Sequence, residues 1–97
     1  MENWQHRRFR RDPALIEEQA IDETILVPLG HEAGRFAGPY VLNEMAGHIW
    51  RLLDGERTVA DIARLIAARY EVSEEEAARD VSAFLGELER LGMVHAV

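Results

Sequence analysis

The side chains that could bind a metal or carry out catalysis are few and widely spaced. The four histidines are His6, His31, His48 and His95, and no two stand four residues apart, the helical spacing of a two-histidine metal site. The sequence has no cysteine, which excludes a disulfide or a thiolate metal site. It has no glycine-rich phosphate loop, and no nucleophile stands in a recognisable pattern with a base. We therefore expect a protein that is not an enzyme, with no catalytic residue, no metal and no cofactor.

The length of 97 residues is typical of one domain with a single hydrophobic core. No apolar run approaches the roughly 18 residues needed to cross a membrane. Residues 1–12 lack the apolar centre of a secretion signal, so secretion is not expected. The absence of cysteine fits a reducing compartment. These features predict a cytoplasmic protein.

The formal charge is distributed unevenly along the chain. Residues 1–11 hold four arginines, Arg7, Arg8, Arg10 and Arg11, and a single acid, Glu2. The rest of the chain holds seven arginines and seventeen acids, a formal charge of −10, which should repel nucleic acid. Residues 1–12 show no hydrophobic period, so they are expected to form a flexible basic arm. The folded domain is expected over residues 13–97.

Short strands are expected in the first half of the domain. Residues 24–29, TILVPL, are β-branched and apolar, which predicts a strand, whereas residues 14–21 suit either a strand or a helix. Residues 35–42, RFAGPYVL, predict a third strand after a turn with two glycines. Because Pro39 has no N–H to donate, this strand is expected at the edge of its sheet. An open edge is a template for pairing with another chain.

Three helices are expected in the second half. Asn43 is a suitable N-cap for a helix that ends before Asp54-Gly55, and Thr58 is a suitable N-cap for the next. Ser73 and Glu76 match a capping box at the start of a third helix over residues 73–91. The fold class is therefore α+β, with short strands forming a small antiparallel sheet before the helices.

DNA binding is one interpretation of this arrangement, because the second and third helices are close enough for a winged helix-turn-helix. In that motif the start of the recognition helix enters the major groove. Here that start is Ser73 followed by Glu74, Glu75 and Glu76, whose carboxylates would repel phosphates. A DNA-binding regulator would depend on the basic arm. A dimer formed by pairing of two edge strands is a third interpretation.

Peptide binding agrees better with what the sequence contains and lacks. An edge strand beside an apolar helix can accept an extended peptide as a further strand, through main-chain hydrogen bonds. The peptide's alternate side chains would then pack against the helix. Such a site requires no catalytic residue, metal or basic surface.

The motifs of the second half resemble those of PqqD-like proteins. They are LN at residues 42–43, IWRLLDG at 49–55, TV at 58–59 and IA at 62–63, followed by DV, FL, L and LG at 80–81, 84–85, 88 and 91–92. The resemblance covers roughly residues 24–94. It implies a winged-helix-like fold in which a three-stranded antiparallel sheet precedes three helices.

The resemblance further implies a RiPP precursor-peptide recognition element, a peptide chaperone that binds the leader of a ribosomally made precursor peptide. The chaperone presents the leader to a modifying enzyme, often a radical SAM enzyme and otherwise a peptidase or cyclase. PQQ biosynthesis is one possibility, and lasso-peptide and other radical SAM pathways use relatives. Carried over to this chain, the leader would pair with the third strand and pack on the third helix. The residues expected to bind it are Phe36, Ala37, Tyr40, Val41, Leu42, Val81, Phe84, Leu85 and Leu88, with Arg79 pairing with an acidic leader residue.

Overall fold

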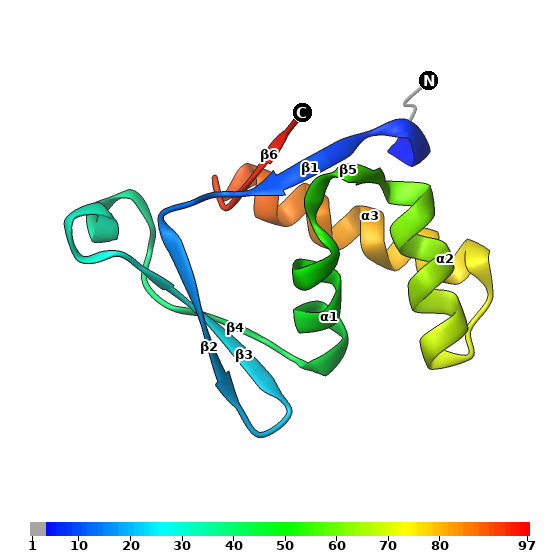
Figure 1. The fold of residues 1–97 in the computed structure, drawn as a ribbon, viewed down its shortest axis with the longest axis horizontal. Helices are drawn as coiled ribbons and strands as arrows, with labels where there is room; N and C mark the ends of the chain where they lie inside the picture. The colour runs from blue at the N-terminus through cyan, green and yellow to red at the C-terminus, as the bar shows by residue number, and fades with distance from the viewer. Residues whose placement is uncertain (1–3) are drawn as a thin grey trace.

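The computed structural model describes residues 4–97. Its strands and helices form two three-stranded antiparallel sheets and a group of three α-helices (Figure 1). The strands are β1 Arg8–Arg11, β2 Leu15–Ala20, β3 Glu23–Pro28, β4 Tyr40–Leu42, β5 Asp54–Thr58 and β6 Val94–Ala96. The helices are α1 Glu44–Leu52, α2 Val59–Tyr70 and α3 Glu74–Arg90, with short 3-10 helices at Trp4–His6 and Gly30–Arg35.

The three α-helices begin where the side-chain caps were predicted. The side chains of Asn43 and Ser73 accept the N–H of Ala46 and Glu76 respectively, which satisfies helix-terminal donors. Thr58 and Asp61 form a complete capping box at the start of α2. These local hydrogen bonds explain why all three helices could be located from the sequence.

The first sheet has the strand order β2-β3-β4. It projects to one side of the helices in Figure 1, and β4 leads directly into α1. The predicted α+β fold, with a three-stranded antiparallel sheet followed by three helices, is confirmed. The ambiguous segment at residues 14–21 supplies β2, which pairs with β3 along its whole length.

The predicted third strand over residues 35–42 is too long. Only Tyr40–Leu42 forms β4, and the residues before it form the 3-10 helix Gly30–Arg35 and an irregular turn. Gly38 has φ +136° and is followed by Pro39, so this turn cannot continue a regular ladder. Phe36 and Ala37 therefore lie in the segment that leads into β4.

The part of the predicted basic arm that the structure describes is folded into a sheet. Residues 8–11 form β1, the central strand of a second sheet with the order β5-β1-β6. Phe9 is 1% exposed, while Arg8 and Arg10 point outward. The expectation missed this strand because Phe9 is its one buried residue and its partners come from the middle and the end of the chain. Residues 1–3 of the predicted arm lie outside the described residues.

The hydrophobic core lies where the helices meet the inner faces of both sheets. Phe9 comes from β1, Leu26 and Leu42 from the other sheet, and Trp50 from α1. The remaining large side chains with almost no exposed surface are Leu53, Val59, Ile62, Ile66, Val81, Leu85, Leu88 and Val94.

Candidate functional site

β4 is an edge strand with one open side. It pairs with β3 over three residues, and within residues 4–97 no strand pairs with its other side. Val41, at its centre, is 55% exposed, whereas Leu42 is buried in the core. The predicted edge position of the third strand therefore agrees with the structure.

The direction of the main chain in β4 follows from the hairpin before it. The N–H of Leu29 donates to the carbonyl of Ala14 at 2.7 Å. Main-chain groups alternate in direction along a strand, and the β2–β3 register is continuous. The odd-numbered residues of β3 therefore direct their N–H and C=O groups toward β2, and the even-numbered residues direct theirs toward β4.

The open side of β4 consequently presents the main chain of Val41. Even-numbered residues of β3 bond to β4 in the pairs Leu26–Tyr40 and Thr24–Leu42. Val41 faces an odd-numbered residue, so its own N–H and C=O point away from β3. The next even-numbered residue of β3 is Pro28, which has no N–H to donate to the segment before Tyr40. The pairing of β3 with β4 ends at Tyr40 for this reason. A guest strand could therefore pair with the N–H and C=O of Val41.

One flank of α3 lies beside this edge. The hydroxyl of Tyr40 donates to Oε2 of Glu87 at 2.5 Å, which joins β4 to the helix. This hydrogen bond, burial and the Glu87 charge raise the pKa of Tyr40, and Arg90 opposes the shift. Residues at helical spacing from Glu87 share its flank. We define the α3 wall as Asp80, Phe84, Glu87 and Leu91.

A hollow of about 380 Å³ lies at the start of β4, next to the end of α3. Phe36, Tyr40 and Leu91 give it an apolar surface, and the Arg35 guanidinium stacks over the Phe36 ring at 5.0 Å. The complete lining is Arg35, Phe36, Ala37, Gly38, Pro39, Tyr40, Arg90, Leu91 and Met93. Two of the predicted residues, Phe36 and Ala37, thus line a hollow beside β4 instead of contributing to its ladder.

The segment before β4 is held in place by Asp12, which is 4% exposed. Its carboxylate contacts Nε2 of His95 at 2.6 Å, accepts from Arg35 at 2.8 Å and accepts the N–H of Ala14 at 2.8 Å. Burial alone would raise the pKa of Asp12, but these three hydrogen bonds outweigh it and lower the pKa to about 2. The sequence offers no local signal for this cluster, because its members come from three distant segments.

The predicted residues on α3 differ in how accessible they are. Val81, Leu85 and Leu88 are 0% exposed and belong to the core, so they cannot touch a peptide on the surface. Their spacing predicted an apolar stripe correctly but could not separate its buried centre from its accessible flank. Phe84 is half-buried at the border of the core and remains available to a guest.

Arg79 does not face β4. It lines a different hollow with Trp4, Ala78 and Ser82, on the side of α3 that carries the N-terminal segment. The structure therefore does not place Arg79 beside a peptide on β4. Glu87, which sequence reasoning missed, occupies the relevant flank. Its spacing of three residues from Phe84 and four from Leu91 was the signal that could have located it.

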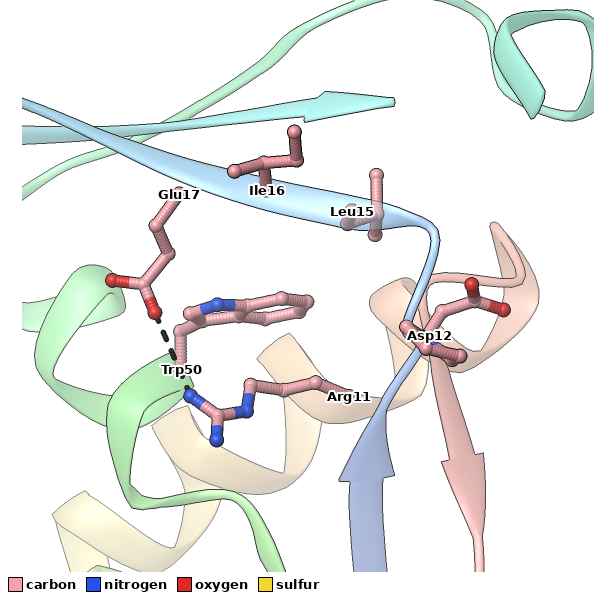
Figure 2. A pocket seen from close by; sticks show the side chains of 7 residues that line it. Arg11, Asp12, Leu15, Ile16, Glu17 and Trp50 are labelled. Atoms are coloured by element: carbon pink, nitrogen blue, oxygen red, sulfur yellow. Dashed lines mark ion pairs between the residues drawn. The ribbon is translucent and has the colours of Figure 1, made fainter. Parts of the chain in front are cut away.

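A further hollow, of about 360 Å³, lies between β2 and α1 (Figure 2). Arg11 and Glu17 form an ion pair of 3.5 Å in front of the Trp50 indole. Because both side chains are partly exposed, this pair contributes little to stability. The hollow adjoins β2, and β3 separates it from the open side of β4.

The sequence matches the profile of the family described as Coenzyme PQQ synthesis protein D (PqqD) over residues 23–94. The chain belongs to the PqqD family. The predicted resemblance to PqqD-like proteins is thereby confirmed. A curated PqqD-family relative from Gluconobacter oxydans (strain 621H), named PqqA binding protein, is 39% identical over 56 residues. The match spans 58% of this chain and 58% of that relative.

Two solved structures share the fold. A lasso peptide synthetase B1 complexed with the leader peptide is 27% identical, with a TM-score of 0.74 over 91% of this chain and 98% of that one. TbiB1 in complex with the TbiA(beta) leader peptide is 23% identical, with a TM-score of 0.73 over 89% of this chain and 94% of that one. The second likeness concerns the fold alone.

Within residues 4–97, no three histidine or acidic side chains are grouped so that they could hold a metal ion. In the same range no helix is both long and apolar enough to cross a membrane.

Proposed function

We propose that this protein binds the leader of a ribosomally made precursor peptide as an added strand on β4 and presents it to a modifying enzyme. The observation that carries this proposal is the outward N–H and C=O of Val41 on an unpaired edge, beside the half-buried Phe84 of α3. Main-chain pairing would supply affinity, and contacts with α3 would supply specificity.

The relatives support the same class of partner. The curated relative is named for binding PqqA, and the lasso peptide synthetase B1 structure was solved with its leader peptide. Both resemblances include residues of the PqqD-family region. We propose that this chain, too, binds a precursor peptide and a modifying enzyme. The expected enzyme is a radical SAM enzyme, a peptidase or a cyclase.

The proposed role is presentation, not catalysis. Strand addition requires only main-chain donors and acceptors and an accessible side-chain surface. β4 and the α3 wall supply these, and the adjoining hollow adds Phe36 and Ala37. We propose Tyr40, Val41 and Phe84 as direct contacts, with Leu42 supporting the strand from the core.

DNA binding has no structural support from the helix that would read the groove. Glu74, Glu75 and Glu76 are exposed at the start of α3, where a recognition helix would meet phosphates. Arg8 and Arg10 lie on β1, in the sheet that includes β5 and β6, and not on that helix.

The proposal is tested by Val41→Pro, which removes the outward N–H and leaves an edge position that tolerates proline. We expect leader affinity to fall roughly tenfold, since one main-chain hydrogen bond contributes about 1 kcal/mol and the ring also obstructs the guest. Titration calorimetry would use synthetic peptides that cover the N-terminal part of any short open reading frame found beside this gene.

Val41→Thr is the matched control, because it keeps the N–H and the β-branched shape. Equal affinity of Val41→Pro and wild type, with both folded by circular dichroism, would contradict strand addition at β4. Sedimentation of the free protein would show whether this edge instead pairs with a second copy.

A further inference from the structure

The α3 wall carries one carboxylate on each side of an apolar side chain. Asp80 stands four residues before Phe84 and Glu87 three residues after it, so the three share one flank of the helix. The hydrogen bond from Tyr40 places Glu87, near the end of this flank, beside β4. A guest strand that pairs with β4 and continues along this flank would meet Glu87, then Phe84, then Asp80.

Both carboxylates are available to a guest. Asp80 and Glu87 are exposed, and within residues 4–97 neither lies within 4 Å of an arginine or histidine nitrogen. Glu87 accepts one hydrogen bond from Tyr40, which leaves its other oxygen unused by that contact. A carboxylate pair in this position attracts cationic side chains.

The neighbouring arginines do not reverse this charge. Arg79 faces the hollow beside Trp4, on the other side of α3. Arg35 is neutralised by Asp12 at 2.8 Å and Glu32 at 3.2 Å. Arg90 is the exception: it lines the hollow at the start of β4 and opposes the effect of Glu87 on Tyr40, so it adds a positive charge at that end of the helix. Glu44, exposed immediately after β4, adds a further negative charge next to the edge.

We propose that the α3 wall selects a guest peptide in which basic side chains flank an apolar one. The inference rests on the proposed function, because it assumes that the guest lies along β4. Asp80 and Glu87 are separated by about 10 Å along the helix. In a guest strand, side chains at alternate positions face the same way and repeat every 6–7 Å. Two such steps span roughly 13 Å, and flexible lysine or arginine side chains can close the difference of about 3 Å. The expected pattern is therefore basic, any, apolar, any, basic, with the apolar side chain against Phe84.

The charge of the whole body favours the same guest. The chain carries a formal charge of −7, with the arginines of β1 included, and this charge accelerates the approach of a cationic segment. The local and the overall charge therefore agree, and both are opposite to the acidic leader residue expected from Arg79.

The test starts from random twelve-residue peptides displayed on phage and selected on the wild-type protein. Sequences that bind equally to Val41→Pro are discarded, which restricts the set to strand-dependent binders. The most enriched peptide is synthesised in its native form and with each lysine or arginine replaced by glutamine. Both forms are titrated by fluorescence anisotropy against wild type, D80N/E87Q and the control E56Q/E75Q. The control removes the same net charge at exposed positions away from the wall.

We expect enrichment of lysine and arginine around an apolar residue. The glutamine form should bind wild type and E56Q/E75Q about tenfold more weakly than the basic form, and D80N/E87Q should bind both forms within about twofold. Enriched sequences that are acidic or neutral would overturn the inference, as would a basic preference that persists in D80N/E87Q.

Failure of the proposed function has a different signature. If Val41→Pro enriches the same peptides as wild type, or if wild type enriches none, the guest does not add to β4. Both the proposed function and the charge preference are then refuted.

Discussion

The Asp12 cluster gives a quantitative prediction, because its charged form is stabilised by three named partners. The pKa of Asp12 falls from 3.8 to about 2 in the folded protein. At 1.36 kcal/mol for each pKa unit, this corresponds to about 2 kcal/mol of folding free energy. The Asp12 side chain is 4% exposed, but Arg35 and His95 are 46% and 36% exposed, so solvent screening makes about 2 kcal/mol an upper value.

The sign of the pH dependence follows from the lowered pKa. The unfolded chain binds a proton near pH 4 and the folded chain only near pH 2. The stabilisation is therefore fully present above about pH 4, and it is lost as the pH falls through this window. Asp12→Asn removes the charge but retains an oxygen that can accept the N–H of Ala14.

The assay is urea unfolding at several pH values between 2 and 7. We expect the free energy of unfolding of Asp12→Asn to be lower than wild type by up to about 2 kcal/mol at pH 7, and the difference to disappear near pH 2. Glu32→Gln is the matched control, because Glu32 pairs with the same arginine in a more exposed position and should cost less than about 0.5 kcal/mol.

Two results would refute this reasoning. One is an Asp12→Asn variant as stable as wild type at pH 7. The other is a loss of stability that stays constant across the pH range, which would mean that the effect arises from packing and not from the carboxylate charge.

Two further predictions compare a buried with an accessible residue of α3, and a crowded with an uncrowded glycine. Leu88→Ala should lower the free energy of unfolding by about 2–5 kcal/mol in urea titrations, whereas Phe84→Ala should mainly weaken leader binding in calorimetry. The reverse result would show that the assignment of core and surface on α3 is wrong. Gly47→Ala should destabilise by about 1–3 kcal/mol in thermal unfolding, because the new Cβ would lie 2.6 Å from Oγ1 of Thr24. Gly86→Ala, with its nearest contact at 3.7 Å, should gain up to about 1 kcal/mol from helix propensity, and a loss there would contradict the model of an open site.

The helices and the middle strand of the first sheet could be predicted from the sequence because their signals are local. Asn43, Thr58 and Ser73 each bond to a main-chain N–H three residues away, so the start of a helix is contained in four consecutive residues. Gly92 adopts φ +76° just after α3, a conformation that glycine readily supplies at the end of a helix. The edge position of β4 was likewise indicated by Pro39.

The side of each helix that meets solvent could not be predicted from spacing alone. Val81 and Phe84 belong to the same apolar stripe, but only the packing of α2 and both sheets decides that Val81 is enclosed and Phe84 reaches the surface. The same holds for Arg79, which lines the hollow beside Trp4, and for Glu87, which bonds to Tyr40 of β4. The charge beside β4 is therefore acidic, whereas the sequence predicted a basic one.

The sequence by itself determined that this chain has three capped helices after a small sheet with an open edge, since caps, turns and hydrophobic periods act between close neighbours. Only the tertiary structure decided that Arg8–Arg11 is a central strand, that the main chain of Val41 faces outward, and that Asp12 joins three segments. Those features depend on hydrogen bonds and burial between residues far apart in the chain, and such pairings are chosen by the fold as a whole.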